Sequence, residues 1–285
     1  MPGVAEIVVR EAGLADLPQI AAVALAAGQD EEWGGAGAAY VAHLLAHGRV
    51  VVGVRGGVIV GFGATRPIGS GPGEVSMLCD LFVDPRLHGG GCGRAMLAEL
   101  WPGRGRRMTF SSLHGNALPL YTSFGLDAWW PLLYLRGRVD AVAAPDGWRA
   151  EPASPAGVAA LELAWTGVDR SDDHLAWARR PGGAGLPARR GGQVMAGGTA
   201  GGAAGEYGLT HLALAPSADA ADAVLAVLVG LRPQDGQVLV CLPGPHPAVR
   251  PLLAAGWRVA EFDLYMATEP GLLDPSRAAP SPALA

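Results

Sequence analysis

The sequence predicts an α/β fold with mixed, largely antiparallel sheets flanked by helices, arranged as two similar domains. Three observations support this prediction. Strand-like and helix-like segments follow one another in the order β-α-α-β-β-β-α-β-α-β over the first half of the 285 residues. Landmarks of that half return in the second half at a constant spacing. Half of the residues are hydrophobic and only 16% are charged, so each half can bury a core.

The first half begins with the alternating segment Ile7–Arg10, which predicts a short strand. A helical pattern then runs to about Ala27, with Asp16 placed to cap it. Gly56-Gly57 separates two β-rich runs, which is typical of a hairpin. The remaining segments expected to be strands are 49–55, 58–64, 74–83, 108–113 and 128–137, and those expected to be helices are 36–47, 94–100 and 117–124.

A repeat of this pattern begins at about Trp148. Three landmarks recur at one and the same offset along the chain: Val83-x-Pro85 as Leu214-x-Pro216, Gly125 as Gly256, and Leu133-Tyr134-Leu135 as Leu264-Tyr265-Met266. We therefore predict two copies of one domain, 1–140 and 141–268, joined near 140–147. The Gly/Ala/Arg-rich segment 180–205 is expected to hold a loose loop, and the Pro/Ala-rich tail 269–285 is expected to be disordered.

The composition excludes several classes of protein. The net charge is −5 and all 21 basic residues are arginine, which gives no support for a nucleic-acid partner. Three cysteines without a C-x-x-C spacing predict neither a disulfide framework nor a metal site. No leader-like segment or long apolar run is present, so we expect a soluble, cytoplasmic protein with no membrane partner. A homodimer is compatible with the sequence.

The segment Asp80–Leu97 contains the most informative pattern. A predicted strand ends at Pro85, four glycines follow, and a helix begins near Arg94. Glycines allow close approach of a ligand, and the first amides of a helix have no acceptor inside the helix. Together with the helix dipole, these N–H groups form a site suited to a pyrophosphate. The same spacing is also compatible with a flexible turn.

These residues resemble the strand–loop–helix signature V-x-P-x-x-[RQ]-x-x-G-x-[GA] of the GNAT superfamily of acyl-CoA-dependent N-acyltransferases. Val83, Pro85, Gly91 and Gly93 match in register, whereas His88 stands where arginine or glutamine is usual. A second, downstream pattern of the family is matched by Asn116, Ala117, Tyr121, Gly125 and Leu126. The resemblance covers the whole N-terminal half, so we expect two tandem GNAT-like domains.

The resemblance implies that acetyl-CoA is the cosubstrate. Its pyrophosphate is expected on the loop formed by His88, Gly89, Gly90, Gly91, Cys92, Gly93 and Arg94. The pantetheine arm is expected to pair with the backbone of Phe82 and Val83, and Asn116 belongs to the same site. His88 either contributes a positive charge or is incidental to backbone amides that suffice. Cys92 is expected to be a small buried hydrophobe.

Acyl transfer to an amine needs a base, an oxyanion donor and an acid for the departing thiolate. The resemblance implies that Tyr121 is the acid, although a packed aromatic residue on an amphipathic helix is the alternative. Asp80 is the first choice for the base or for an ammonium anchor, because charge inside a central strand is costly unless it is used. Glu74 is the second choice, and Asp80 or Glu74 could instead be a residue at the rim of the site. His114 is a weaker candidate, with a polar strand end as the alternative.

The C-terminal copy is predicted to be degenerate, because the residues at the repeat offset lack nearly every chemical group of the first copy. Asp80 becomes His211, and Tyr121 becomes Leu252. The loop residues His88, Gly89, Gly91 and Gly93 become Asp219, Ala220, Asp222 and Val224. Carboxylates at a helix N-terminus repel a pyrophosphate. The polar segment Asp169–His174 is either functional or a helix cap with a solvated turn.

The sequence therefore predicts an acetyltransferase that acts on the primary amine of a small molecule, with one working N-terminal site. A peptide or protein N-terminus is an alternative acceptor. A non-catalytic acyl-CoA-binding regulatory module, or a scaffold that binds no CoA, is an alternative from a different class.

Overall fold

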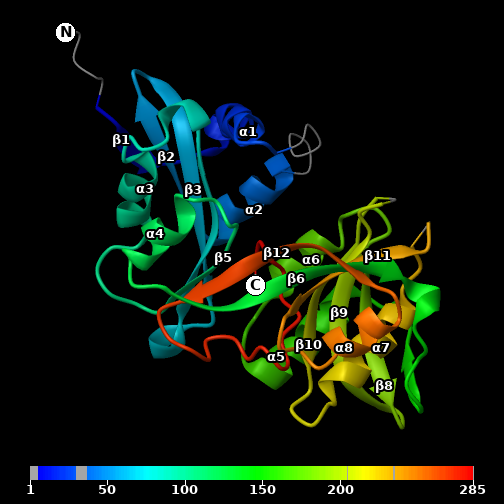
Figure 1. Cartoon of the computed structure of the whole chain (residues 1–285). Coiled ribbons are helices and arrows are strands. Elements are labelled where there is room, and N and C mark those ends of the chain that lie inside the picture. Colours follow the sequence, from blue (N-terminus) through cyan, green and yellow to red (C-terminus); the bar gives the residue numbers. More distant parts are fainter. Residues whose placement is uncertain (1–5, 30–36, 204, 234, 285) are drawn as a thin grey trace. The chain divides into compact units, whose positions relative to one another are not determined.

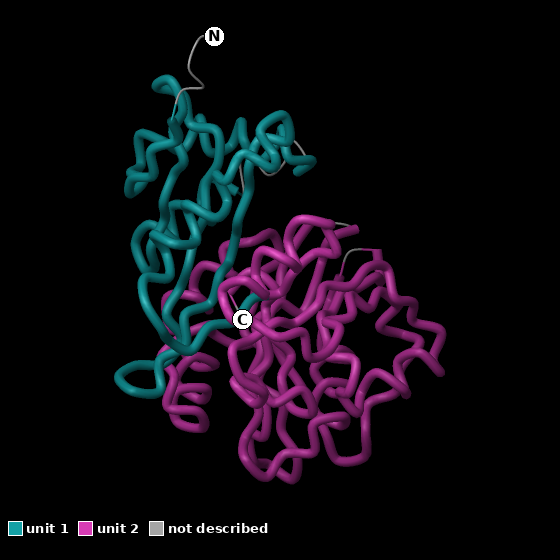
Figure 2. Tube along the Cα trace, turned by 60° about the vertical axis from the view of Figure 1, so that its left-hand side comes forward, with its two compact units in different colours: residues 1–109 teal, residues 110–285 magenta. Residues whose placement is uncertain are grey.

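Two units make up the chain, Met1–Thr109 and Phe110–Ala285, shown in different colours in Figure 2. The computed structural model describes residues 6–29, 37–203, 205–233 and 235–284, and Figure 1 labels their helices and strands. The two units are described separately below.

Unit 1 contains a sheet with the strand order β1-β2-β3-β4-β5. The first four strands pair antiparallel, and β4 pairs parallel with β5. The strands are β1 (Val8–Glu11), β2 (Arg49–Arg55), β3 (Val58–Ile68), β4 (Val75–Val83) and β5 (Arg107–Ser111), the last of which continues across the boundary between the units. The helices are α1 (Leu17–Ala26), α2 (Ala38–His47) and α3 (Cys92–Leu100). Residue 36, the expected start of the second helix, lies outside the described residues.

Helices cover both faces of this sheet, as the alternation of strand side chains shows. Val52 and Phe62 are fully buried in a cluster with residues of α1 and α2. The next position along β2, Gly53, points to the opposite face, where a Cβ atom would lie 2.6 Å from the sulfur of Cys92 in α3. Glycine at this position therefore allows α3 to pack closely on the sheet.

Unit 2 contains a sheet with the strand order β12-β6-β11-β10-β9-β8-β7. Among the described residues of this unit, only β10 and β11 pair parallel. The strands are β6 (Asp127–Arg138), β7 (Trp148–Ala150), β8 (Ala184–Arg190), β9 (Gln193–Gly201), β10 (Gly208–Leu214), β11 (Gln237–Pro243) and β12 (Arg258–Ala267). The helices are α4 (Ala117–Thr122), α5 (Pro155–Thr166), α6 (Ser171–Trp177), α7 (Ala220–Gly230) and α8 (Val249–Ala254).

The predicted order of elements occurs twice along the chain. From β1 to β6 the order is β-α-α-β-β-β-α-β-α-β, and from β7 to β12 it is the same. Gly125 and Gly256, which follow α4 and α8, have φ angles of +87° and +86°, a conformation that glycine adopts without strain. The mixed α/β fold and the repeat are thereby confirmed, including the spacing that relates these two glycines.

The position of β6 differs from the domain boundary predicted at residue 140. β6 lies between β11 and β12 and pairs antiparallel with both. It is therefore a strand of the C-terminal sheet, although its sequence ends the first copy. The division between the units falls at residues 109 and 110. The sequence could not show this because strand pairing partners are not encoded in local periodicity.

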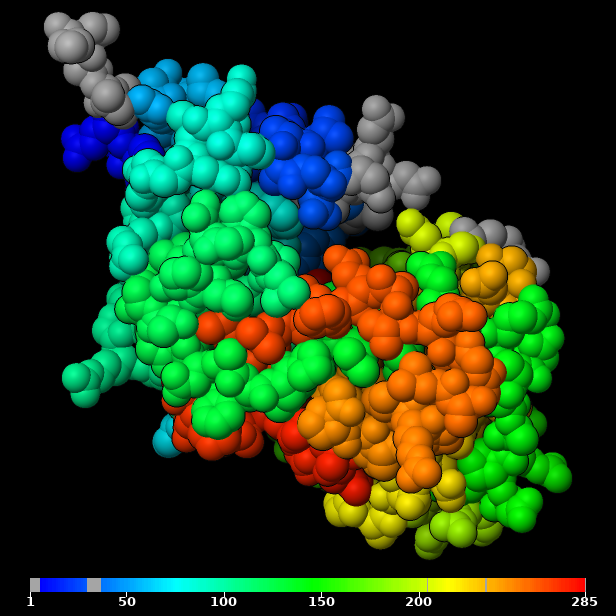
Figure 3. All heavy atoms as spheres, in the orientation of Figure 1, coloured from blue at the N-terminus to red at the C-terminus, as the bar shows by residue number. Residues whose placement is uncertain are grey.

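Two further expectations were wrong. Segment 180–205 is not a loose loop, because it contains the antiparallel pair β8 and β9. The tail is not disordered over its described residues: Ala279 bridges Leu212 of β10, and Arg277 donates hydrogen bonds to the carbonyls of Ala215 and Ala218 at 2.7 and 3.1 Å. In Figure 3 its red atoms lie against the rest of unit 2. Small apolar residues and prolines can pack on a strand edge without forming regular structure of their own.

Close packing of Gly137 in β6 provides a test of this arrangement. A Cβ atom there would lie 2.3 Å from the indole ring of Trp257, which is 2% exposed. We expect Gly137→Ala to lower the free energy of unfolding by about 1–3 kcal/mol, because a packed core does not accept the extra methyl group. Chemical denaturation measures this change. Gly105→Ala, at a position with open space around it, is the control and is expected to have little effect.

Candidate active site

The glycine loop connects β4 to α3. Asp84 accepts a hydrogen bond from the backbone N–H of Arg86 at 3.0 Å and pairs with its guanidinium at 2.5 Å, which fixes the start of the loop. Gly91, with φ of +83°, is the N-cap of α3. The first hydrogen bond of the helix joins Ala95 N–H to the Gly91 carbonyl. The amides of the first turn have no acceptor inside the helix, as anion binding requires.

Cys92 anchors the first turn of α3 through its side chain. The side chain is 1% exposed and lies against β2 and β3, where Gly53 and Gly61 leave room for its sulfur. Burial raises the pKa of this thiol. The expectation that Cys92 is a small buried hydrophobe is confirmed, so its contribution to a ligand site is limited to its backbone.

The backbone of β4 presents alternate amides to its two edges. Asp84 N–H donates to the carbonyl of Val60 in β3 at 2.9 Å. By alternation, the backbone of Phe82 also faces β3, whereas Leu81 and Val83 direct their amides to the other edge. Of the two residues expected to pair with pantetheine, Val83 directs its amide to this open edge and Phe82 does not. Phe82 instead packs its ring against Phe62, with ring centroids 5.3 Å apart.

His88 lies on the exposed part of the loop. Its Nε2 is 3.0 Å from the carbonyl oxygen of Val83, so the ring connects the loop to the end of β4. A pocket of about 380 Å³ adjoins the loop and is lined by Glu6, Ile7, Arg55, Arg86, Leu87, His88 and Gly90. Its two arginines provide positive charge next to the glycine loop.

A β-bulge determines the direction of Asp80. In the pairing of β3 with β4, Ala64 lies opposite Asp80 and Thr65 lies opposite Leu78, so Cys79 is the extra residue. Because Ala64 and Thr65 point to opposite faces, Asp80 and Leu78 do so too. Asp80 faces α1 and α2, the same face as Phe62.

The two oxygens of the Asp80 carboxylate have different environments. The hydroxyl of Tyr40 in α2 donates a hydrogen bond to it. Oδ2 is buried and has no hydrogen-bond partner among the described residues. Burial raises the pKa of Asp80 to about 6, although the hydrogen bond from Tyr40 acts in the opposite direction. Tyr40 was not identified from the sequence, since nothing local distinguishes it from other residues on an amphipathic helix.

The other predicted residues lie elsewhere. Glu74 is exposed before the first residue of β4, about 20 Å along the strand from Asp80. Tyr121 in α4 belongs to unit 2 and is 7% exposed. Asn116, also in unit 2, is exposed and precedes α4; its N–H donates to Nδ1 of His114 at 3.3 Å. The structure thus brings Asp80, Val83 and the loop together within unit 1 and does not bring Glu74 to them.

The C-terminal copy has different chemistry at the corresponding positions. Asp219 caps α7 by accepting a hydrogen bond from Asp222 N–H at 2.9 Å. The extra residue of β10 is Thr210, opposite the step from Ala200 to Thr199 in β9. The bulge therefore recurs at the predicted offset, and His211 takes the place of Asp80.

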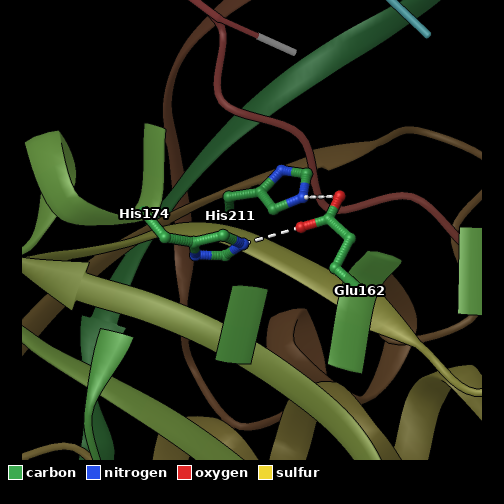
Figure 4. Close-up of side chains that lie close together, drawn as sticks. All are labelled: Glu162, His174 and His211. Atoms are coloured by element: carbon green, nitrogen blue, oxygen red, sulfur yellow. Dashed lines mark hydrogen bonds and ion pairs between the residues drawn. The ribbon is translucent and has the colours of Figure 1, made fainter. Parts of the chain in front are cut away.

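His211 belongs to a buried cluster with Glu162 and His174, shown in Figure 4. Nε2 of His174 lies 2.7 Å from one oxygen of Glu162, and Nε2 of His211 lies 3.0 Å from the other. Nδ1 of His174 is 2.6 Å from the hydroxyl of Thr199. Of the two interpretations of segment Asp169–His174, a solvated turn is excluded for Asp173 and His174, which are fully buried.

Three nitrogen and oxygen atoms of this cluster lie within 4.8 Å of one another, a spacing that could hold a metal ion. Arg170, however, places its Nε 3.3 Å from Glu162, and a buried guanidinium opposes a divalent cation at this distance. Burial alone would raise the pKa of Glu162, but His211, His174 and Arg170 hold it well below its usual range. The donor set therefore fits a buried hydrogen-bond network better than a metal centre.

Comparisons with known proteins agree with this geometry. Residues 20–125 match the model of the acetyltransferase (GNAT) family. A putative acetyltransferase from Pyrococcus horikoshii has a similar fold, with a TM-score of 0.68 at 15% identity over 98% of this chain and 94% of that chain. A tandem GNAT protein from the clavulanic acid biosynthesis pathway has a TM-score of 0.60 at 16% identity, over 94% of this chain and 100% of that chain. A GCN5-related N-acetyltransferase from Sphaerobacter thermophilus has a TM-score of 0.56 at 17% identity, over 95% of this chain and 98% of that chain. No curated protein matches the sequence.

The chain thus shares the fold of structures described as GNAT acetyltransferases, with a glycine loop between β4 and α3. Residues 20–125, which include this loop, are similar to the GNAT family, and over the rest of the chain the similarity to GNAT structures is one of fold. Acetyl-CoA is the general cosubstrate of this family. Within the described residues, none of the helices has the length and apolar character needed to cross a membrane.

The Glu162 cluster provides a test of its structural role. We expect Glu162→Gln to destabilise the protein at pH 7 by about 3–5 kcal/mol, because it leaves Arg170 and two imidazoles without their shared carboxylate. Since folding lowers the pKa of Glu162, its contribution to the free energy of unfolding is lost as the pH falls. The difference in stability between Glu162→Gln and the wild type should therefore become smaller in acid. Denaturation at several pH values measures this. Exposed Glu151→Gln is the control, and equal effects of the two variants would contradict the prediction.

Proposed function

We propose that the N-terminal copy transfers an acetyl group from acetyl-CoA to the primary amine of a small molecule. The loop from His88 to Arg94 binds the pyrophosphate through the first amides of α3. Arg55 in the adjoining pocket adds positive charge suited to the phosphates of CoA, whereas Arg86 is paired with Asp84. The thioester end of the pantetheine arm lies along the outward edge of β4.

The buried carboxylate of Asp80 is the observation that carries this proposal. A central strand holds a charged residue only at a cost, and here Oδ2 has no partner among the described residues. A pKa of about 6 makes the carboxylate a stronger base than an ordinary aspartate while it stays ionised at pH 7. Both properties suit a group that accepts a proton from an incoming ammonium.

The burial of Asp80 and the open edge at Val83 support the following sequence of steps. The acceptor amine enters as an ammonium and gives a proton to Oδ2 of Asp80, either directly or through a water molecule. Its nitrogen attacks the thioester carbon, and the N–H of Val83 stabilises the oxyanion. Collapse of the intermediate breaks the C–S bond, and the CoA thiolate leaves and takes up a proton. Tyr121 remains the proposed acid for that last step.

A pH profile tests the role of Asp80. Because the base must be ionised, kcat/KM should fall as the pH drops through about 6. Asp80→Asn should lower kcat/KM by about 10²–10⁴. The same variant should raise the thermal stability above pH 6, where the wild type carries a buried charge, and not below pH 4. Glu74→Gln is the control; a loss of activity there, with Asp80→Asn active, would refute the assignment.

Tyr40→Phe tests whether the hydrogen bond from Tyr40 lowers the pKa of Asp80. Without the hydrogen bond from Tyr40, the pKa of Asp80 should rise, so the acid limb of the profile should move to higher pH. Activity well above that pH should change less than in Asp80→Asn. An unchanged acid limb would show that Tyr40 has no influence on the base.

Calorimetric titration with acetyl-CoA tests the cosubstrate site. We expect one site per chain, lost in Gly91→Asp, because this change gives the first loop the carboxylate that the second copy has at Asp222. Gly105→Asp adds the same charge outside the loop and should leave binding intact. Two sites in the wild type would contradict the degenerate nature of the second copy, and no binding at all would indicate a scaffold.

A further inference from the structure

The strands β10 and β11 of the C-terminal copy pair over only a short stretch. These strands pair parallel at Gly208 with Leu239 and at Leu209 with Val240. β10 then continues to Leu214 and β11 to Pro243, and no further pairing joins them in this described part of the chain. The edge of β10 that faces β11 is therefore open to another partner from Thr210 onward.

The C-terminal segment 279–284 takes this edge. Leu212 N–H donates to the carbonyl of Ala279 at 3.0 Å, on the side of β10 away from β9. In the repeat, Leu212 is the counterpart of Leu81, one of the two residues whose amides face the open edge of β4. The segment thus occupies the position at which, in the N-terminal copy, the proposed function places the pantetheine arm.

Further contacts hold the segment at both ends. Arg277 donates to the carbonyls of Ala215 and Ala218, just beyond β10. Arg170 donates to the carbonyl of Leu284 at 2.8 Å, and the Leu284 residue is 2% exposed. Through Arg170 the segment is connected to the Glu162 cluster, and Figure 4 shows the red ribbon of the chain's end beside it.

The same copy is unsuited to acyl-CoA. Asp219 and Asp222 lie at the start of α7, where the N-terminal copy has His88 and Gly91. Two carboxylates there repel a pyrophosphate. A peptide carries no such group and can still satisfy the open amides of β10, as peptides do when they add to a strand edge.

We propose that the C-terminal copy is a peptide-binding site that has replaced a CoA site, with the chain's own C-terminal segment as its ligand. The ligand class is a short peptide of small residues and prolines, Ala-Pro-Ser-Pro-Ala-Leu here, which pairs with β10 at Ala279 and then turns at 282–284. Its recognition uses the Leu212 amide, the guanidinium of Arg170 and a buried leucine. The comparison with pantetheine depends on the proposed function, whereas the peptide contacts do not.

Cleavage after folding tests this proposal. A protease site inserted after the exposed Gly271 allows the full chain to fold, to be cut and to be freed of residues 272–285 by dialysis. A labelled peptide of these residues should then rebind with one site per chain. The peptide with Leu284→Asp should bind about tenfold or more weakly, because a buried leucine contributes a factor of this size. Ser276→Asp, at an exposed position, adds the same charge and should bind like the unaltered peptide.

Acetyl-CoA separates this proposal from the proposed function. The cut and stripped chain should bind acetyl-CoA at one site, as the intact chain does. A second site that appears on stripping would overturn the peptide assignment, because the segment would then only block a CoA site. Failure of the intact chain to bind acetyl-CoA would refute the proposed function, while the peptide result would stand.

Hydrogen exchange on the uncut chain covers the case in which the stripped chain unfolds. The Leu212 amide should be protected in the wild type and in Ser276→Asp. It should exchange at least about tenfold faster in Leu284→Asp, in which the segment is released. Equal exchange in all three chains would overturn the proposal.

Discussion

One extra residue in the fourth strand of each copy determines where the chemistry lies. The bulges at Cys79 and Thr210 reverse the alternation of side chains, so Asp80 and His211 face the first two helices of their copies instead of the helix that follows the loop. Because of the bulge, Asp80 and Leu78 face opposite sides of the sheet, and Asp80 shares its face with Phe82. A bulge is therefore the local distortion from which both the proposed active site and the Glu162 cluster follow.

The two copies use the same position in opposite ways. In the N-terminal copy the buried carboxylate keeps one oxygen without a partner among the described residues, which costs stability and leaves the group reactive. In the C-terminal copy both oxygens of Glu162 accept hydrogen bonds from imidazoles, and Arg170 pairs with one of them. This network satisfies both oxygens of Glu162, whereas Nδ1 of His211 is buried without a hydrogen-bond partner among the described residues.

Loss of the glycine loop and the docking of the C-terminal segment have related physical reasons. Once carboxylates cap α7, the diverging strands β10 and β11 still present an unpaired edge, and unpaired backbone groups in a protein interior are costly. The segment that ends the chain satisfies one such group at Leu212 and buries Ala279 and Leu284. A groove of the fold is thus kept, with a different occupant.

The sequence by itself determined the order of elements, the repeat and the glycine loop, because these depend on local periodicity, on turn residues and on a constant spacing between the two copies. It also identified Asp80 as a residue that a central strand would not hold without a use. Only the tertiary structure decided that β6 belongs to the C-terminal sheet, that Tyr40 reaches Asp80, that Glu162 joins two histidines, and that the tail is ordered. Each of these is a contact between residues distant in the sequence, and local patterns carry no information on which partner a strand edge or a buried carboxylate will meet.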